Sequence, residues 1–308
     1  MKKVAILFNP SAGKGKALKK RQELEKLLRK FEINYDLFLT RNEEDLKELA
    51  REKTDKYRTL VGAGGDSTFN IIVNEIKKKR VNTTFGMIAL GSSNDVAEEF
   101  EIRSLEKACA ALKRGKTKRI DLGCIIKDKK ILRYYLGQAN IGLGVLVNKY
   151  VDELARRKPN LGKIQIFAGA LGIINSYLSQ KLPFPLTLES ETARVEGDFI
   201  LAVFNNTRYW ATGKKVNPHA LPDDGRLDCC LIKKCSFPRF ARLVFLATKG
   251  KHTREKEIET LQSEYFEVSS EKAFEIQSDG EIIESFDQCS KFKKIKFKVI
   301  PQALNIIC

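Results

Sequence analysis

The nine residues Gly62–Asn70, "GAGGDSTFN", place three glycines and one acid between an apolar run and a helix-like run. The apolar run before them, "RTLV" at 58–61, is typical of a buried strand, and "TFNIIVNEIKKK" has apolar residues at helical spacing. In a parallel sheet this turn would lie at the carboxyl end of a strand, where ligands bind. Glycines let backbone N–H groups approach an anion, and a helix N-terminus adds positive charge. The pattern favours a phosphate-binding turn, although a tight turn in which Asp66 only caps the helix stays open.

Two other loops carry the same kind of sequence. "NPSAGKGK" at 9–16 follows the apolar run "VAILF", and "LGSSNDVA" at 90–97 follows "FGMIAL". We expect both loops at the same edge of the sheet as Gly62–Asn70, because the carboxyl ends of parallel strands meet there. The GxxxxGK[ST] pattern of a P-loop is absent from the sequence. Ser, Asn and Asp also cap helices, so a capped turn is the alternative for each loop taken alone.

Strand-like and helix-like segments alternate through the first 125 residues. Helical spacing is present in "ALKKRQELEKLLRKF" at 17–31 and in "EEDLKELAREK" at 43–53, with Asn42 as a candidate N-cap. The strand-like run "YDLFL" at 35–39 lies between them. Short connections between alternating elements indicate a parallel sheet covered by helices on both faces.

The second half of the chain has a different pattern, because short strand-like runs separated by turns follow one another. Two helix-like stretches interrupt them, at roughly 147–180 and 237–249, which predicts an antiparallel sandwich or curled sheet. The pattern changes near 118–126. We therefore expect an α/β fold with a parallel-sheet nucleotide-binding domain at 1–123 and an antiparallel β-sandwich substrate domain at 124–301. The tail at 302–308 is expected to pack back onto the first domain.

Composition narrows the possible functions. The chain has 308 residues and a formal net charge of +17, which favours anionic partners such as nucleotides or an acidic membrane surface. The basic residues are spread along the chain and no aromatic-interleaved RNA motif is present, which argues against nucleic acid. Two histidines make zinc chemistry and Ser/His triads poor candidates, and seven cysteines without CxxC spacing indicate reduced thiols in a cytoplasm. No apolar stretch approaches the roughly 20 residues that span a bilayer, so we expect a soluble protein.

The motifs "NPSAGK", "GGDSTFN" and "LGSSNDVA", in this order, resemble the catalytic domain of the diacylglycerol kinase and sphingosine kinase superfamily, above all its soluble bacterial lipid kinases. The resemblance continues through "IDLG" (120–123), "NIGLGVLVN" (140–148), "LPDDGR" (221–226) and "SDGE" (278–281), and it covers nearly the whole chain. It implies a first domain similar to the nucleotide-binding fold of NAD kinases and phosphofructokinases. It also implies a C-terminal β-sandwich, with ATP and Mg²⁺ as cofactors.

The resemblance assigns catalytic roles to four acids. It implies that Asp279 in "SDGE" is the general base, and it implies an acidic network that reaches the catalytic Mg²⁺ through water, made of Asp66, Asp95 and Asp121. This chemistry is coherent, because phosphoryl transfer needs positioned phosphates, cations and a base near the attacking hydroxyl. Spaced carboxylates suit Mg²⁺, which keeps several waters. Taken without the other motifs, however, Asp279 is better interpreted as a common Asp-Gly turn residue.

The resemblance also implies the residues that hold the cofactors. A second, structural metal would lie at the "LPDDGR" turn, which alone is ordinary turn chemistry. Its ligands would be the Asp224 carboxylate and the carbonyls of Leu221 and Arg226. The candidate nucleotide contacts are Asn9, Thr40, Gly64, Gly65, Asp66, Ser67, Thr68, Asn70, Ser92 and Asn94.

One position departs from the family pattern, because Ser67 stands where the family usually has glycine. If that position needs a positive φ, serine would strain the loop by about 1 kcal/mol or more. If it does not, the hydroxyl could add a phosphate contact. The change puts catalytic competence in question and leaves the fold assignment intact.

The leading hypothesis is an ATP- and Mg-dependent kinase that phosphorylates the hydroxyl of a lipid such as diacylglycerol. It would be a cytoplasmic protein, peripheral at an anionic membrane, and its oligomeric state, homodimer included, is left open. The alternatives are an NAD kinase-like or other small-molecule kinase, and a nucleotide- or lipid-binding protein with weak catalysis. The apolar segment at 161–180 either lines a lipid entrance or is an ordinary buried helix.

Overall fold

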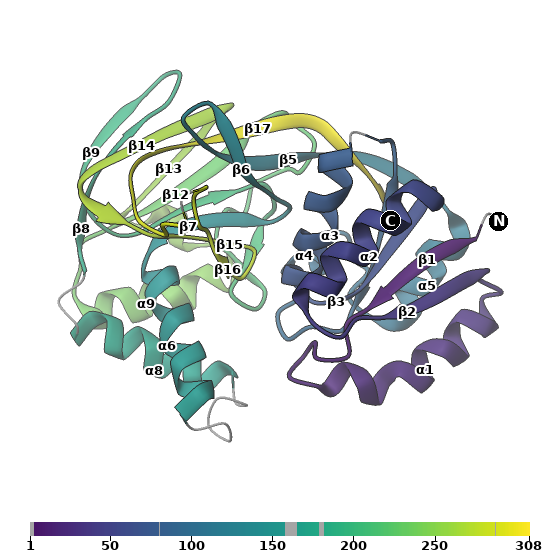
Figure 1. Cartoon of the computed structure of the whole chain (residues 1–308). Coiled ribbons are helices and arrows are strands. Elements are labelled where there is room, and N and C mark those ends of the chain that lie inside the picture. The colour runs from purple at the N-terminus through teal and green to yellow at the C-terminus, as the bar shows by residue number, and fades with distance from the viewer. Residues whose placement is uncertain (1–2, 80, 158–164, 179–181, 287) are drawn as a thin grey trace. The chain divides into compact units, whose positions relative to one another are not determined.

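Two compact units make up the chain. Figure 1 shows the computed structural model, which describes residues 3–79, 81–157, 165–178, 182–286 and 288–308. Unit 1 contains Met1–Leu122, Ala211–Gly213 and Pro301–Cys308, and unit 2 contains Gly123–Trp210 and Lys214–Ile300. The predicted fold class is confirmed, because unit 1 is built on parallel strand pairs and unit 2 on antiparallel ones.

Unit 1 contains a parallel sheet. Its strands are β1 (Val4–Phe8), β2 (Tyr35–Leu39), β3 (Thr59–Gly64), β4 (Thr84–Ala89) and the end of β17 (Phe292–Ile307). They lie in the order β2–β1–β3–β4–β17, each parallel to its neighbour. All five residues of β1 are buried, as are all but the first of β3 and of β4. Such continuous burial is what a parallel sheet covered on both faces requires.

The helices of unit 1 follow its strands. They are α1 (Lys16–Lys30), α2 (Glu43–Lys56), α3 (Asp66–Lys79), α4 (Asp95–Glu99) and α5 (Leu105–Arg114). Asn42 caps α2 as predicted, because its side-chain oxygen accepts a hydrogen bond from Asp45 N at 2.9 Å. Ser104 caps α5 in the same way, with Lys107 N at 3.2 Å. Such a cap contributes about 1 kcal/mol to helix stability.

Two long strands run from one unit into the other. β5 (Thr117–Lys127) leaves unit 1 after Leu122, and β17 enters unit 1 at Pro301. The first part of β17 pairs antiparallel with β14 (Tyr265–Phe274), and Asn305 and Ile306 pair parallel with β4. Lys77 of α3 donates a hydrogen bond to the Ala303 carbonyl at 2.8 Å. The sheet of unit 1 therefore includes residues from the end of the sequence.

Unit 2 is rich in antiparallel strands. Besides β14 they are β6 (Lys130–Tyr135), β7 (Gln138–Gly142), β8 (Phe184–Glu189), β9 (Arg194–Asn205), β10 (Tyr209–Trp210), β11 (Lys214–Lys215), β12 (Leu227–Lys233), β13 (Ile258–Ser263), β15 (Ile276–Ser278) and β16 (Glu281–Ile282). The helices are α6 (Leu143–Arg157), α8 (Gln165–Leu178), α9 (Phe237–Ala247) and the 3₁₀ helix η1 (His252–Arg254). β9 is central, because it pairs with β7, β8 and β12.

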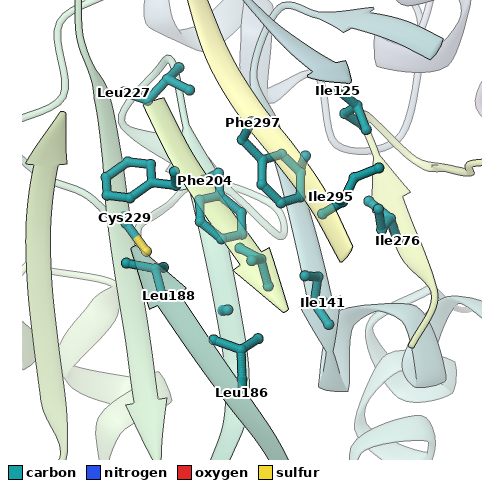
Figure 2. Close-up of a cluster of buried hydrophobic side chains, with 14 of the residues drawn as sticks. Ile125, Ile141, Leu186, Leu188, Phe204, Leu227, Cys229, Ile276, Ile295 and Phe297 are labelled. Carbon is teal, nitrogen blue, oxygen red and sulfur yellow. The ribbon is translucent and has the colours of Figure 1, made fainter. Parts of the chain in front are cut away.

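The main core of unit 2 lies between its strands, as Figure 2 shows. The rings of Phe204 and Phe297 stack with their centroids 4.0 Å apart, and Phe266 lies 5.6 Å from Phe204. All three side chains are fully buried. Each contributes roughly 1.5–3 kcal/mol by leaving water, and the aromatic pairs add to this.

A second apolar cluster lies on the other face of β9. Ala202 and Phe204 point into the main core, whereas Leu201 and Val203 belong to the second cluster. Phe240 and Leu243 of α9 complete this cluster, and Figure 1 shows α6, α8 and α9 together on this side of unit 2. Burial on both faces explains why residues 199–204 of β9 form a continuous apolar run, not an alternating one.

The helical stretch expected at roughly 147–180 is two helices in the described residues. α6 begins earlier than expected, at Leu143, and α8 ends at Leu178, while 158–164 and 179–181 lie outside the described residues. Part of the apolar segment 161–180 falls in these gaps. In the described part, Ser176 is buried but Ile174 is 43% exposed, so α8 is not an ordinary fully buried helix. None of the helices in the described ranges is long and apolar enough to cross a bilayer.

Candidate functional site

The three glycine-containing loops of unit 1 contact one another at the carboxyl ends of β1, β3 and β4. Asn9 N donates to the Ala63 carbonyl at 2.9 Å, and Asn9 Nδ2 donates to Thr68 Oγ1 at 3.0 Å. Leu90 N donates to the Gly64 carbonyl at 2.7 Å. The loop after β3 therefore lies between the other two, as the parallel-sheet argument predicts. We call this group of loops the rim.

Glycines make the close contacts within the rim possible. A Cβ on Gly91 would lie 2.5 Å from Gly65 Cα, and a Cβ on Gly64 would lie 2.4 Å from Thr68 Oγ1. Gly13, with φ +59°, would place a Cβ 2.6 Å from the Leu90 carbonyl oxygen. At Gly91 and Gly13 no larger residue fits without moving the backbone, whereas at Gly64 it would meet the Thr68 side chain of the same turn. Gly91 and Gly13 thus hold loop against loop, which the sequence argument for an open phosphate cradle did not foresee.

The N-terminus of α3 lies in the rim. Phe69 N donates to the Gly65 carbonyl at 3.1 Å, which is the first bond of the helical pattern. The N–H groups of Ser67 and Thr68 precede it and have no partner within the helix. Ser67 belongs to α3, so its φ is helical and serine causes no strain. Of the two alternatives for serine at position 67, the structure therefore has the one without backbone strain.

Asp66 joins two of the loops. Its carboxylate accepts hydrogen bonds from Asp95 N and Val96 N, both at 3.2 Å. It therefore caps the short helix α4, which belongs to the next loop, although Asp66 itself begins α3. Asn94, with φ +57°, precedes α4 and donates from Nδ2 to the Gly91 carbonyl at 2.9 Å.

Asp95 is fixed by a segment distant in sequence. Its Oδ1 accepts from Gly213 N at 2.7 Å, and its Oδ2 accepts from Thr212 N at 3.2 Å. Burial raises the pKa of the Asp95 carboxyl, while these two amides act in the opposite direction. Ala211, Thr212 and Gly213 all have positive φ, so Asp95 holds a strained backbone segment.

The third acid of the predicted network lies with other partners. Asp121 is fully buried, and its Oδ1 accepts from Gln302 N at 2.7 Å. Within the described residues, no group of three or more His, Cys, Asp or Glu side chains could hold a metal ion. The acids Asp66, Asp95 and Asp121 therefore bind backbone amides and do not form a preformed metal cage.

The other candidate nucleotide contacts differ in their surroundings. Thr40 is buried at the end of β2, and its Oγ1 donates to the Phe8 carbonyl at 3.3 Å. Asn70 is buried in α3, where Asn74 Nδ2 donates to its Oδ1 at 3.0 Å. Ser92 is exposed in the loop after β4. Thr40 thus lies next to the end of β1, whereas Asn70 is held one turn inside the helix.

In unit 2, Asp279 occupies a two-residue turn between β15 and β16. Asp279 and Gly280 both have positive φ, +44° and +97°, as a type I′ hairpin requires. The Asp279 side chain is only 5% exposed. Its Oδ2 accepts from Leu136 N at 2.7 Å, and its Oδ1 accepts from Gly137 N at 3.1 Å and Gln138 N at 2.9 Å. Asp279 is thus both the turn residue and a carboxylate fixed by three amides.

Buried amide side chains surround the start of β7 beside this turn. Gln138 Nε2 donates to Gln277 Oε1 at 3.1 Å, and Asn140 Nδ2 donates to Gln138 Oε1 at 2.9 Å. Asn206 Nδ2 donates to the Leu136 carbonyl at 3.0 Å. These bonds fix the backbone whose N–H groups hold Asp279, because buried polar groups must be paired to be tolerated.

The "LPDDGR" turn of unit 2 precedes β12. Asp224 Oδ1 accepts from Arg226 N at 3.0 Å, and Leu221 is 51% exposed. The nearby Asp228 was not singled out from sequence; burial and then the Asp224 charge raise its pKa to about 6. Among the residues that the structure describes, Asp228 Oδ2 is buried without a hydrogen-bond partner. Two neighbouring carboxylates beside an exposed turn suit a hard cation that prefers oxygen ligands, so these residues fit a metal.

The rim likewise fits the phosphates of a nucleotide. The amides at the start of α3 point away from the helix body, and a helix N-terminus favours negative charge. Asp66 would repel phosphate directly, but a carboxylate beside phosphates suits Mg²⁺, which is bound by one or two carboxylates and keeps several waters.

Several residues of this arrangement were missed by the sequence argument. The amides of Thr212, Gly213 and Gln302 and those of residues 136–138 hold the acids, yet backbone donors carry no side-chain signal. Asp228 did carry a signal, since it lies four residues after Asp224 at the start of a strand.

Comparison with known proteins agrees with these features. The model of the diacylglycerol kinase catalytic domain matches residues 3–125, and that of the YegS C-terminal NAD kinase beta sandwich-like domain matches residues 137–308. YtlR of Bacillus subtilis, which bears a provisional name as a lipid kinase, is 26% identical over 90% of this chain and 93% of its own. A diacylglycerol kinase of the same organism is 25% identical over 91% of this chain and 90% of its own.

A solved structure shares the fold. The crystal structure of a diacylglycerol kinase from Bacillus anthracis is similar with a TM-score of 0.71 at 16% identity, covering 99% of this chain and 96% of that one. The two domain models together span nearly all of the described residues, in the order in which the rim and the Asp279 turn occur. The chain therefore belongs to the diacylglycerol kinase catalytic-domain family that carries the NAD kinase-like C-terminal β-sandwich.

Proposed function

We propose that this protein transfers the terminal phosphoryl group of ATP to the hydroxyl of a lipid such as diacylglycerol. The observation that carries the proposal is the rim, where Asn9, Gly64 and Leu90 bring three loops together around the N-terminus of α3. Family membership supports the kinase class. The names of relatives at 24–25% identity, "Diacylglycerol kinase", motivate the acceptor.

The rim would bind and orient the phosphates. The amides of Ser67 and Thr68 would donate to phosphate oxygens, and the Ser67 hydroxyl would add a donor that glycine lacks. The carboxylates of Asp66 and Asp95 are already fixed by backbone amides. They would position the cation and its bound water beside the phosphates. When bound, ATP with Mg²⁺ supplies the transferable phosphoryl group and charge neutralisation.

Asp279 would be the base in this scheme. A carboxylate held in one orientation by three amides can accept the proton of an acceptor hydroxyl without losing energy to reorientation. The backbone N–H groups of Leu136, Gly137 and Gln138 supply these three bonds. The turn 221–226 with Asp228 would hold a structural cation in unit 2.

The acceptor would be a lipid at a membrane surface. The net charge of +17 favours an anionic bilayer, with each Lys or Arg near the surface contributing about 1 kcal/mol of attraction. We propose that the protein acts there as a peripheral enzyme at the cytoplasmic face.

The test is a kinase assay with labelled ATP and Mg²⁺. Dioleoylglycerol in detergent micelles, NAD, and micelles without acceptor are the three arms, and mass analysis identifies the product. We expect phosphatidic acid in the first arm alone, lost when EDTA removes the metal. Product in the NAD arm would support an NAD kinase-like enzyme instead. ATP binding without product in any arm would support a binding protein.

A further inference from the structure

The solvent-facing side of α9 exposes an apolar stripe. Phe237, Ala241 and Phe245 lie four residues apart and so share one face of the helix. Phe245 is 65% exposed and Phe237 is 40% exposed. The opposite face is already occupied, since Phe240 and Leu243 are buried against the strands of unit 2. The stripe is therefore not the core-facing side of an amphipathic helix.

Helix α8 extends this apolar surface. The Tyr177 ring lies 5.4 Å from the ring centroids of both Phe237 and Phe240, so the end of α8 packs beside the start of α9. Ile174, one turn before Tyr177, is 43% exposed. Figure 1 shows both helices on the same side of unit 2. We call Ile174, Phe237, Ala241 and Phe245 the α8–α9 face.

The chain segment that contains α9 is rich in positive charge. Residues 233–257 contain eight Lys and Arg but two Glu, and both Glu bind Arg239. Lys234 before the helix and Lys249 and Lys251 after it are exposed. An exposed aromatic stripe between basic residues is the pattern of segments that lie in a bilayer interface, where aromatic rings enter the headgroup region and cations meet anionic lipid.

We propose that the α8–α9 face docks the protein on an anionic phospholipid bilayer. Two copies of the face would repel each other through their shared positive charge, which argues against a symmetric dimer contact here. The docking uses two signals together, apolar insertion and charge, because neither alone gives stable anchoring. The inference deepens the proposed function, since it names the surface through which a lipid kinase would reach its substrate.

Vesicle flotation without ATP tests the proposal. The probe is vesicles of equal parts phosphatidylglycerol and phosphatidylcholine, with pure phosphatidylcholine as the neutral arm. We expect binding to the anionic vesicles and a reduction of about tenfold in affinity for Phe245→Ser, from the transfer free energy of one ring. Lys249→Glu combined with Lys251→Glu should reduce affinity by about 30-fold or more, and wild-type binding should weaken with salt.

Matched controls separate the face from general effects. Phe286 is also 65% exposed but lies outside the face, so Phe286→Ser should bind like the wild type. Lys272→Glu with Lys293→Glu changes net charge equally at exposed sites elsewhere in unit 2 and should have a smaller effect. Equal losses for Phe245→Ser and Phe286→Ser would overturn the proposal. A second result would also overturn it. In that result Phe245→Ser binds vesicles as tightly as the wild type, and light scattering shows a wild-type dimer that Phe245→Ser does not form.

Failure of the docking surface and failure of the kinase function give different results. With a short-chain diacylglycerol dissolved as monomers, Phe245→Ser should turn over at the wild-type rate, because no bilayer is involved. A kinase that is active on monomers while Phe245→Ser still binds vesicles normally refutes only the docking surface. Vesicle binding that depends on Phe245 without any kinase activity refutes only the proposed function.

Discussion

In unit 1, Asp66 accepts hydrogen bonds from amides 29 and 30 residues away, whereas in unit 2 Asp279 accepts from amides 141 to 143 residues away. The rim is built from neighbouring βα turns, whose contacts follow from the order of strands in a parallel sheet. The Asp279 turn is held by the connection between β6 and β7, which lies near the start of unit 2 in the sequence. The rim is thus specified by local motifs, and the orientation of Asp279 by the tertiary fold of the sandwich.

The largest test of this difference is Asp279→Asn. We expect turnover to fall by about 100-fold or more, since a general base contributes this much. ATP affinity should stay near that of the wild type, because the rim lies in unit 1 and is unchanged. The asparagine NH₂ group would also face backbone N–H donors, so urea should unfold unit 2 more readily. Steady-state kinetics, calorimetric ATP titration and urea unfolding measure the three effects.

Glu281→Gln is the matched control, because Glu281 is a second acid of the same hairpin and pairs with Arg133. It should change turnover little. If Asp279→Asn kept full activity, Asp279 would not be the base. The amides that hold Asp279 would then matter for the stability of unit 2 and not for catalysis.

Crowding the rim should give the next largest effect. Gly91→Ala places a Cβ 2.5 Å from Gly65 Cα, whereas Gly197→Ala meets only the Phe199 ring at 3.6 Å. Neither glycine has a positive φ, so the pair differs in space alone. We expect Gly91→Ala to lower the free energy of unfolding by about 1–3 kcal/mol and to weaken ATP binding. Gly197→Ala should do neither, and equal ATP affinities for both variants would show that loop contact is not what shapes the rim.

Acid should destabilise unit 2 through His252. Its side chain is 2% exposed, with Nε2 3.0 Å from the Val216 carbonyl oxygen. Burial lowers the pKa of His252 below its ordinary value of 6.5, while the Val216 carbonyl opposes this. Below pH 6.5 the unfolded chain therefore binds a proton that the folded chain does not, and the free energy of unfolding falls. The slope from this group cannot exceed about 1.4 kcal/mol per pH unit.

Urea unfolding between pH 7.5 and 5.5 measures this effect. The fluorescence of Trp210, the single tryptophan of the chain, reports on unit 2. His252→Gln should flatten the pH dependence of unfolding, while His219→Gln should leave it as in the wild type. The same pH dependence in His252→Gln and wild type would remove His252 as its source.

The smallest effect is expected for Ser67→Gly, which restores the usual family residue. Ser67 lies in α3, so glycine should cost roughly 0.5–1 kcal/mol of stability through chain entropy. ATP affinity should change by only a few-fold, which competition binding with a fluorescent analogue can measure. A gain in turnover of more than tenfold would show that serine impairs the rim.

Local patterns predicted unit 1 well for a physical reason. The parallel strands and the contact of the three loops followed from glycine, Asn and Asp residues at strand ends, and Asn42 was recognisable as a cap. The hydrogen-bond donors to Asp95 and Asp121 were not predictable, because Thr212, Gly213 and Gln302 donate through backbone N–H groups. In unit 2 the sandwich followed from short strand-like runs. The three amides that hold Asp279 come from a connection whose position depends on the pairing of β7, β9 and β15.

Strand β17 has a consequence for how the chain is made. Residues 305 and 306 pair with β4, so the parallel sheet lacks an edge partner until all of unit 2 has been synthesised. During translation β4 would stay without this neighbour until the end of β17, which is synthesised after unit 2, becomes available. A nascent chain stalled before residue 301 should thus be more sensitive to protease in its N-terminal half than a finished one, and the two units should mature together.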